Sequence, residues 1–335
     1  MNYLISITTL IFILLFKDHL VFKDENNVQD FHHNPTSRLG GLIVIFGVLY
    51  AFTSYEEHSL NEFFIATLPI LAIGLLEDID RQIKPIYRLL AMCISVSIVY
   101  FLMDIGIYSL DIEFADSLLA NPLISFMFTL LVLVGLINSI NIIDGFHGLM
   151  LGFSLMVFLA LAYVASQIGD AFLINIYLLL AGSIFILFLV NFPFGKVFSG
   201  DMGAYFIGLI MGTSGLLLGI RNEAVSHWFI LLLVLYPLYE TVFSIFRRKI
   251  NHKKDAMQPD SNHFHSLVYK KLTSKKCFAK NPNICNAMTS IITWIFASIS
   301  IIPAIFFYED NSILISYSFF YMALYSLIYI RLERI

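Results

Sequence analysis

The chain has 335 residues, of which 59% are hydrophobic and only 13% are charged, and its mean hydropathy is +0.81. Soluble proteins carry about 25% charged residues, so this composition excludes an ordinary soluble protein and indicates one that crosses a membrane several times. The net charge of −4 says little until the charges are sorted by side, and we expect no nucleic-acid partner. Three cysteines give no disulfide framework.

Apolar runs along the chain predict eleven membrane-spanning helices, because a helix satisfies its own backbone hydrogen bonds in lipid. The first run is expected to be a retained span, since no basic residue precedes it and no small-residue cleavage site follows it. Several runs are shorter than the ~20 residues that a span needs, so some helices must extend into polar flanks. The runs lie near residues 1–16, 39–53, 62–76, 86–103, 121–137, 148–166, 170–190, 203–220, 227–246, 288–307 and 312–330.

The basic residues are distributed unequally between the two sides of these spans. One set of alternate loops, with the C-terminal tail, holds 19 of the 20 Lys and Arg residues, and only Arg221 falls on the other side. The positive-inside rule therefore places this set in the cytoplasm, the N-terminus outside and the C-terminus inside. We expect one all-α transmembrane catalytic domain over residues 1–335, with cytoplasmic active-site loops at 17–38, 77–88, 138–148, 191–202 and 247–287.

The polar segment 138–148, which reads NSINIIDGFHG, separates two apolar runs and contains no Lys or Arg. Asn138, Asn141 and Asp144 recur every third residue, so in a helix they would share one stripe. Two glycines would let the backbone turn or approach a ligand closely. A carboxylate at the edge of hydrocarbon is costly without a partner, which makes Asp144 a functional candidate. The alternative is an ordinary interhelical turn capped by Asn and Asp.

Other polar motifs fall on the same predicted side of the membrane. Four acids, Glu77, Asp78, Asp144 and Asp201, lie in short loops and so stay near the membrane surface. Together with the basic loop 247–287 they fit one anionic substrate and one Mg²⁺ ion, which takes one or two carboxylates plus substrate phosphates. Carboxylates alone would repel a phosphate, so a metal ion is needed to offset the negative charge of both.

Five sequence blocks carry a resemblance to a known family. They are PTSRLGG from Pro35, GLLEDIDRQIKPIYRLL from Gly74, NSINIIDGFHGL from Asn138, FPFGKVFSGDMGAYFIG from Phe192 and PDSNHFHSL from Pro259. In this order they resemble the polyprenyl-phosphate N-acetylhexosamine-1-phosphate transferase superfamily, from about Pro35 to about Leu272. This superfamily includes the enzymes that start O-antigen, enterobacterial common antigen and teichoic acid, and the phospho-muramoyl-pentapeptide translocase.

The resemblance implies a reaction and its partners. Undecaprenyl phosphate would attack the β-phosphorus of a UDP-N-acetylhexosamine, releasing UMP and leaving a lipid-diphosphate-sugar in the bacterial inner membrane. Mg²⁺ would be the cofactor, for which Mn²⁺ could substitute. Membrane lipids would surround the protein, and a homodimer stays open.

The resemblance also implies roles for individual residues. Glu77 and Asp78 occupy the family's acidic pair, which would position or deprotonate the lipid phosphate. Asp201 follows Gly200 in the family's Gly-Asp motif and is the first choice as metal ligand, with a helix N-cap as its alternative. The expected catalytic residues are Glu77, Asp78, Asp144, Asp201, His263 and His265, the metal ligands Asp201 and Asp144, and the substrate contacts Arg38, Arg88, Asn138, Asn141 and Gly200.

Three departures from the family's pattern put the sugar in doubt. Glu77 stands where Asp is commoner, His147 where many members have Asp or Asn, and Ser266 where many have a third His. They favour UDP-GlcNAc or a close derivative over the peptidoglycan translocase's substrate, because that enzyme's loop usually has three successive histidines. The translocase reaction remains the runner-up.

Four other interpretations compete with these assignments. A secondary transporter would carry ionisable groups near the membrane midplane, where Glu240 is the one acid well inside a run. A scaffolding protein would not need four clustered acids. His263 and His265 could instead face solvent, or form a zinc site with Cys277 and Cys285, although that cysteine spacing is longer than usual.

Overall fold

The computed structural model describes residues 2–16, 36–52, 58–79, 83–251, 262–274 and 282–334. Parts of the predicted loops 17–38 and 247–287 lie outside these ranges, and so does Cys277. Within them the chain forms fourteen α-helices and one isolated parallel bridge, between Ser37 and Val197. The helices are α1 (Asn2–Phe16), α2 (Gly41–Phe52), α3 (His58–Ile79), α4 (Pro85–Met103), α5 (Glu113–Leu119), α6 (Pro122–Ile142), α7 (Leu149–Ile168), α8 (Ala171–Asn191), α9 (Gly200–Arg221), α10 (His227–Leu233), α11 (Leu235–Asn251), α12 (Phe264–Ser274), α13 (Pro282–Phe306) and α14 (Asn311–Glu333).

The predicted all-α class is confirmed, and each predicted apolar run corresponds to a helix or to a bent pair. Among the described helices, α4, α6, α7, α8, α9, α13 and α14 are long and apolar enough to cross a membrane. The pair α10–α11 also passes when its two helices are taken together, but it bends by 70°. The chain is therefore a polytopic membrane protein, while the count of eleven spans and their orientation stay predictions.

The helices extend further into the polar motifs than the apolar runs do. α3 continues to Ile79 and α6 to Ile142, and α9 begins at Gly200. The helical backbone satisfies its own hydrogen bonds whether or not its side chains are apolar, so a run marks the apolar part of a helix and not its ends. The two short helices α5 and α12 lie in segments that the sequence predicted to be loops.

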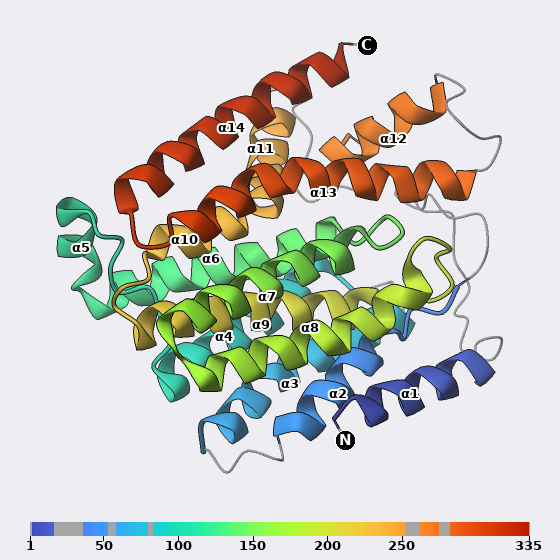
Figure 1. Ribbon diagram of the computed structural model, residues 1–335, viewed down its shortest axis with the longest axis horizontal. Coiled ribbons are helices and arrows are strands. Elements are labelled where there is room, and N and C mark those ends of the chain that lie inside the picture. The colour runs from blue at the N-terminus through green and yellow to red at the C-terminus, as the bar shows by residue number, and fades with distance from the viewer. Residues whose placement is uncertain are drawn as a thin grey trace.

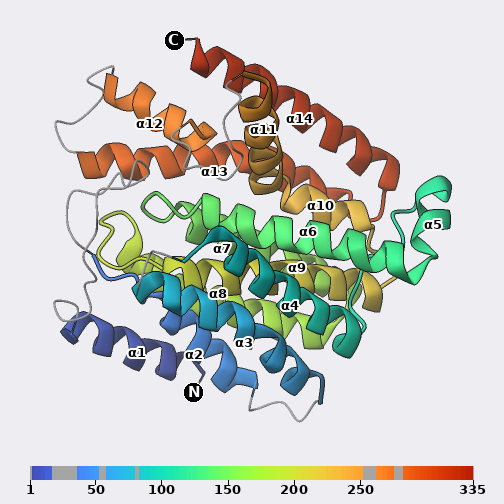
Figure 2. The same cartoon turned by 180° about the vertical axis from the view of Figure 1, so that it is seen from behind.

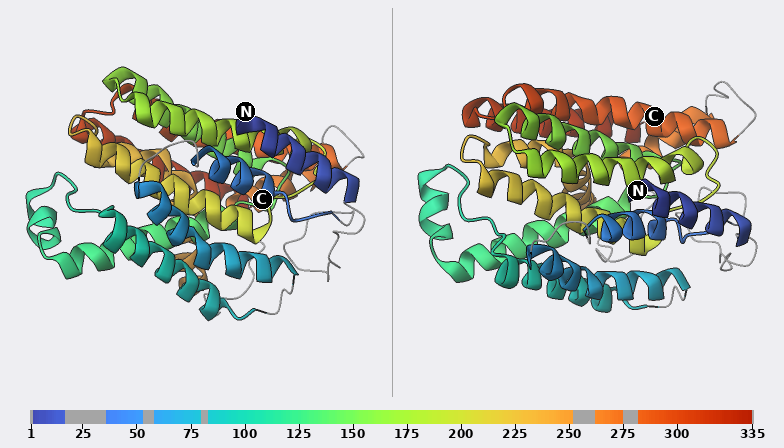
Figure 3. Two further views of the ribbon diagram at one scale, coloured as in Figure 1. Left: turned by 90° about the horizontal axis from the view of Figure 1, so that it is seen from below. Right: turned by 60° about the horizontal axis from the view of Figure 1, so that its bottom comes forward.

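Most helices run side by side along the long axis of the molecule, whereas α11 stands across α13 and α14 (Figures 1 and 2). α5 lies at one end of the bundle and α12 at the opposite end. The same separation is visible after the molecule is turned (Figure 3). The two ends of the bundle therefore differ in structure, and the polar motifs gather at the α12 end.

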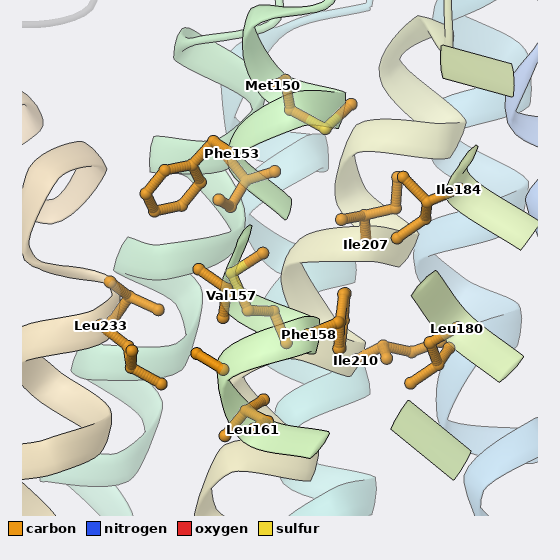
Figure 4. Packing of buried hydrophobic residues seen from close by; sticks show 14 of the residues in the cluster. Met150, Phe153, Val157, Phe158, Leu161, Leu180, Ile184, Ile207, Ile210 and Leu233 are labelled. Atoms are coloured by element: carbon orange, nitrogen blue, oxygen red, sulfur yellow. The ribbon is translucent and has the colours of Figure 1, made fainter. Parts of the chain in front are cut away.

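A layer of apolar side chains joins the central helices. Side chains of α7 lie between those of α8 and α9 on one side and that of Leu233 of α10 on the other (Figure 4). All of these side chains are buried, and dense packing of this kind resists relative movement of the helices. The labelled members are Met150, Phe153, Val157, Phe158, Leu161, Leu180, Ile184, Ile207, Ile210 and Leu233.

α9 is the most enclosed helix among the candidate spans, because 89% of the residues in its 18-residue apolar stretch are buried. It packs against α2, α3, α6 and α7. A Cβ atom on Gly203 would lie 2.7 Å from the Cα atom of Gly41 in α2, and one on Gly74 of α3 would lie 2.4 Å from the Cα atom of Met202. Small residues permit such close helix contact inside a membrane. The first turns of α9 are thus wedged between α2 and α3.

We predict that Gly203→Val destabilises the protein, because its Cβ would force α2 and α9 apart. Overpacking of this kind typically costs about 1–3 kcal/mol. The measurement is thermal unfolding of the purified protein in detergent. Gly135→Ala is the matched control, since a Cβ on Gly135 meets nothing within 4 Å. An unfolding temperature for Gly203→Val equal to that of the control would show that the close approach is not needed.

Candidate active site

The first and fourth sequence blocks pair with each other at the α12 end of the bundle. The backbone N–H of Phe198 donates to the carbonyl of Ser37 (2.9 Å), that of Gly40 to Phe198 (2.8 Å), and that of Gly41 to Ser199 (2.9 Å). These bonds hold the segment before α2 against the segment before α9. Arg38 lies within this pairing, so its position is fixed relative to the start of α9.

Asp78 of α3 caps the N-terminus of α9 from outside that helix. Its Oδ1 accepts the backbone N–H of Asp201 (2.8 Å) and its Oδ2 accepts that of Met202 (3.1 Å). The preceding residue Ser199 makes no side-chain cap bond to α9, so Asp78 satisfies donors that the helix leaves open. Asp78 is only 1% exposed. With donors on both oxygens, it is better placed to position Asp201 than to remove a proton.

Asp201 lies in the first turn of α9 and not at its N-cap, so the alternative interpretation as a capping residue is wrong. It is partly exposed, and within the described residues its carboxylate accepts no hydrogen bond. Its charge repels those of Asp78 and Asp144. Asp201 is thus the most available of the three carboxylates.

Asp144 lies in the turn after α6, because that helix ends at Ile142. The predicted single helical stripe therefore holds for Asn138 and Asn141 but is wrong for Asp144. The hydroxyl of Ser199 donates to Oδ2 of Asp144. Burial and the charge of Asp201 raise the pKa of Asp144 to about 7, against the opposing effects of the Ser199 hydroxyl and the Arg38 charge.

Glu77 points to a different neighbour from Asp78. Its Oε1 lies 3.3 Å from Nη1 of Arg88 on α4. Arg88 also interacts with the hydroxyl of the buried Tyr205 on α9. Arg88, which the sequence predicted to contact phosphate, therefore has a carboxylate partner within the protein. Asn138 is exposed on α6, and no hydrogen bond joins it to the described acids.

Gly200 is required by its surroundings. Its φ angle is +71°, and a Cβ there would lie 2.2 Å from the carbonyl oxygen of Arg38 and 2.6 Å from both carboxylate oxygens of Asp78. The sequence predicted that the backbone of Gly200 approaches a phosphate. Gly200 therefore admits Asp78 and Arg38 to the start of α9, and a phosphate contact of its backbone stays a prediction.

The two histidines of the last block are buried, so the interpretation as solvent-facing residues is wrong. His263 is 6% exposed and His265 3%. Their rings stack with centroids 5.4 Å apart and planes 16° from parallel. The ring of Phe146, two residues after Asp144, contacts His265 edge-on at 5.4 Å. The histidine block therefore lies against the turn that carries Asp144.

Comparison with known proteins shows which sequences this chain is similar to. The model of glycosyl transferase family 4 matches residues 60–219, which include the second, third and fourth blocks. A probable undecaprenyl-phosphate N-acetylglucosaminyl 1-phosphate transferase of Bacillus subtilis is 26% identical over 274 residues, 78% of this chain and 75% of the relative. The undecaprenyl-phosphate alpha-N-acetylglucosaminyl 1-phosphate transferase of Thermotoga maritima is 26% identical over 75% of this chain and 74% of the relative. A phospho-N-acetylmuramoyl-pentapeptide-transferase of Borrelia turicatae is 25% identical over 70% and 75%.

The family model and these relatives support the resemblance to the polyprenyl-phosphate N-acetylhexosamine-1-phosphate transferase superfamily. Together they indicate a phosphosugar transferase. The superfamily's motifs come from five separate segments, and the contacts described above join them at one end of the bundle.

His147, one of the departures from the superfamily's pattern, is buried behind the neighbouring loop. Its Nδ1–H donates to the carbonyl of Pro193 (2.8 Å), and its backbone N–H donates to Oδ1 of Asn286 on α13 (2.6 Å). Burial lowers the pKa of its ring. A neutral imidazole in this position ties the Asp144 turn to the loop before α9.

Several residues that shape the transferase site were missed by the sequence interpretation. Ser199 holds Asp144, and Asn191 accepts the backbone N–H of Gly148 while donating to the carbonyl of Val197 (2.7 Å). Glu240, noted only as an acid inside an apolar run, contacts His263. Ser199 and Asn191 lie within or beside the fourth block, which was the only available signal for them.

The carboxylates available for a metal ion are few. No group of three or more His, Cys, Asp or Glu side chains in the described ranges is arranged to hold one, which leaves the proposed zinc site without support there. Asp201 and Asp144 remain as one or two carboxylate ligands. Mg²⁺ typically takes that number from a protein and completes its shell with water and phosphate, so the donor set fits this ion.

We predict that the metal-free protein loses stability as pH rises from about 4 to about 7. The pKa of Asp144 is raised in the folded state, so folding favours its neutral form, and this contribution disappears as the carboxyl ionises. Asp201→Asn removes one source of the raised pKa and should make the loss smaller. The measurement is thermal unfolding in detergent with a chelator across this pH range. Glu223→Gln, at an exposed position, is the control; a steeper loss in Asp201→Asn than in the control would contradict the prediction.

Proposed function

We propose that this protein transfers an N-acetylhexosamine-1-phosphate from a UDP-sugar to undecaprenyl phosphate at the cytoplasmic face of the bacterial inner membrane. The observation that carries the proposal is the convergence of Asp78, Asp144 and Asp201 with Arg38 at the start of α9. The names of the relatives, which specify polyprenyl-phosphate acceptors and N-acetylglucosamine-1-phosphate transfer, support it.

In this reaction an oxygen of the lipid phosphate forms a bond to the β-phosphorus of the UDP-sugar. The bond from that phosphorus to the oxygen bridging the two phosphates breaks, and UMP leaves with the bonding electrons. A phosphate monoester has a second pKa near 6, so the nucleophile is largely ionised at neutral pH. No strong general base is needed, and the main obstacle is the approach of two anions.

Different residues of the site would help the two anions to approach each other. Asp201 and Asp144 would hold Mg²⁺, which when bound supplies positive charge to the diphosphate. Arg38 adds a fixed cation beside them. Asp78 keeps the first turn of α9 in place, and His263 and His265, beside the Asp144 turn, would offer hydrogen-bond donors to the diphosphate.

The donor sugar is proposed to be UDP-GlcNAc or a close epimer or deoxy derivative. Relatives from several organisms carry N-acetylglucosamine in their names, and the loop around His263 lacks the three successive histidines expected of the translocase. The peptidoglycan translocase reaction is the second candidate, because a relative of that name covers a similar share of the chain. The product would start a cell-envelope polysaccharide such as O-antigen.

The test measures UMP release by the purified protein with Mg²⁺, undecaprenyl phosphate and a panel of UDP-sugars. We expect turnover of a UDP-N-acetylhexosamine in preference to UDP-N-acetylmuramoyl-pentapeptide. Asp201→Asn keeps the shape but removes the anionic charge, and loss of a transition-state charge stabiliser typically costs ~10²–10³-fold in rate. Removal of Mg²⁺ by a chelator should cost at least as much.

The control for this assay is Glu223→Gln, far from the site at the opposite end of α9, which should keep its rate. Activity of Asp201→Asn within about threefold of the unsubstituted protein would move the metal ligand to another acid. Preference for the muramoyl-pentapeptide donor would replace the first candidate by the second.

The orientation has its own test. In a cysteine-free background, Ser117→Cys on α5 and Ser274→Cys at the end of α12 occupy exposed positions at opposite ends of the bundle. The distribution of Lys and Arg predicts that an impermeant thiol reagent labels Ser117→Cys in cells with a permeable outer layer, and labels Ser274→Cys only after the inner membrane is opened. Labelling of Ser274→Cys before that step would place the site on the wrong face for a cytoplasmic UDP-sugar.

A further inference from the structure

Glu240 of α11 is a fully buried acid to which the proposed reaction assigns no role. Its carboxylate receives four donors. Oε1 accepts Nδ1–H of His263 (2.8 Å) and the hydroxyl of Ser244 (3.1 Å), and Oε2 accepts the backbone N–H of Phe264 (3.1 Å) and the hydroxyl of Tyr325 on α14. Burying a carboxylate costs several kcal/mol unless its partners compensate, so this position calls for a reason beyond packing.

The contact with His263 suggests that reason. A carboxylate on Nδ1 holds a proton on that nitrogen and sets the orientation of the ring. The other ring nitrogen, Nε2, then points away from Glu240. A neutral side chain could anchor the loop as well, but an ionised acceptor makes the stronger hydrogen bond to the ring and so holds its orientation more firmly.

Side chains of α11 contact both histidines at the same ring nitrogen, Nδ1. Tyr236, Glu240 and Ser244 are spaced four residues apart and therefore share one face of α11. The Tyr236 hydroxyl lies 3.3 Å from Nδ1 of His265, as Glu240 lies against Nδ1 of His263. The two rings are nearly parallel.

Both Nε2 atoms consequently face away from this stripe of α11. Phe146 contacts His265 and belongs to the turn that carries Asp144. The stripe thus presents a pair of pre-oriented imidazoles beside the site where the diphosphate is proposed to bind. Pre-orientation of donors is a main source of catalytic electrostatic stabilisation.

We propose that Glu240 is a positioning residue for the transfer reaction, holding His263 with Nδ1–H bound inside the protein and Nε2 directed at the diphosphate of the UDP-sugar. This inference rests on the proposed function. It assigns the buried acid to the chemistry, acting through His263.

A double-substitution cycle tests the proposal, with UMP release as the readout. Glu240→Gln keeps the shape of the side chain and removes its charge, and loss of such a supporting partner typically costs about 10–100-fold in activity. His263→Ala should cost at least as much. If Glu240 acts through His263, adding Glu240→Gln to His263→Ala should lower kcat/KM by less than about threefold more, because the two effects are not additive.

Tyr325→Phe is the matched control for this cycle. It removes one donor from Oε2 of Glu240 without touching His263. It should lower the unfolding temperature in detergent yet keep kcat/KM within about threefold. Equal losses from Glu240→Gln in the presence and absence of His263 would overturn the proposal and leave Glu240 a structural anchor.

A second measurement leaves Glu240 intact, in case its substitution prevents folding. In His263→Ala, added imidazole can fill the vacated space and, in its imidazolium form, donate from one nitrogen to Glu240 and from the other to the substrate. 1-Methylimidazole has at most one N–H and cannot do both. We expect imidazole to restore UMP release several-fold more than 1-methylimidazole; equal rescue by both, or rescue by neither, would contradict the proposed arrangement.

The two proposals fail in different ways. If the unsubstituted protein releases no UMP from any UDP-sugar in the panel, the proposed function is wrong. If it releases UMP but the cycle is additive, the function stands and only the positioning role of Glu240 is wrong.

Discussion

The geometry of the site depends on the way the N-terminus of α9 is held. This helix starts with open backbone donors in an environment where water is scarce, and Asp78 of α3 supplies the acceptors. Gly200 and Gly203 make room for that contact by admitting Asp78, Arg38 and α2 at distances that no side chain would permit. Because Asp201 belongs to the same first turn, the cap that completes the helix also places the most available carboxylate.

The three aspartates differ in how much of their hydrogen-bonding capacity the protein already uses. Asp78 has backbone donors on both oxygens, Asp144 has the Ser199 hydroxyl on one, and Asp201 accepts no hydrogen bond from the described residues. This order indicates that Asp78 holds the backbone of α9 and that Asp201 is free of donors from these residues and available to bind a ligand. Asp144 keeps one carboxylate oxygen available. The repulsion among them opposes folding and is the kind of strain that a bound cation relieves.

The sequence predicted the helical class and the positions of the apolar runs, because mean hydropathy over a span is a strong signal. The distribution of Lys and Arg also predicted that five motifs lie on one side of the membrane. The sequence did not predict that Asp78 contacts α9, since the two lie more than 120 residues apart and either could have paired with solvent. Asp144 does not share the predicted stripe, because α6 ends two residues before it. The sequence marks a helix end poorly where polar residues continue the helical spacing. The burial of His263 and His265 depends on α11 and α14, which no local pattern around the histidines reveals.

Asp78 and Glu240 show the same physical solution at two places. Each is a buried acid whose oxygens accept backbone N–H groups from a distant segment, Asp201 and Met202 in one case and Phe264 in the other. In each case that segment carries a polar side chain toward the site, Asp201 or His263. A buried carboxylate is a demanding anchor, because it tolerates few arrangements of its donors. That intolerance is useful at the end of a helical bundle, where it adds to the apolar contacts of Phe146, Val197 and Phe264. Packing fixes the helices, and buried acids help it to fix the short segments that present the reactive groups.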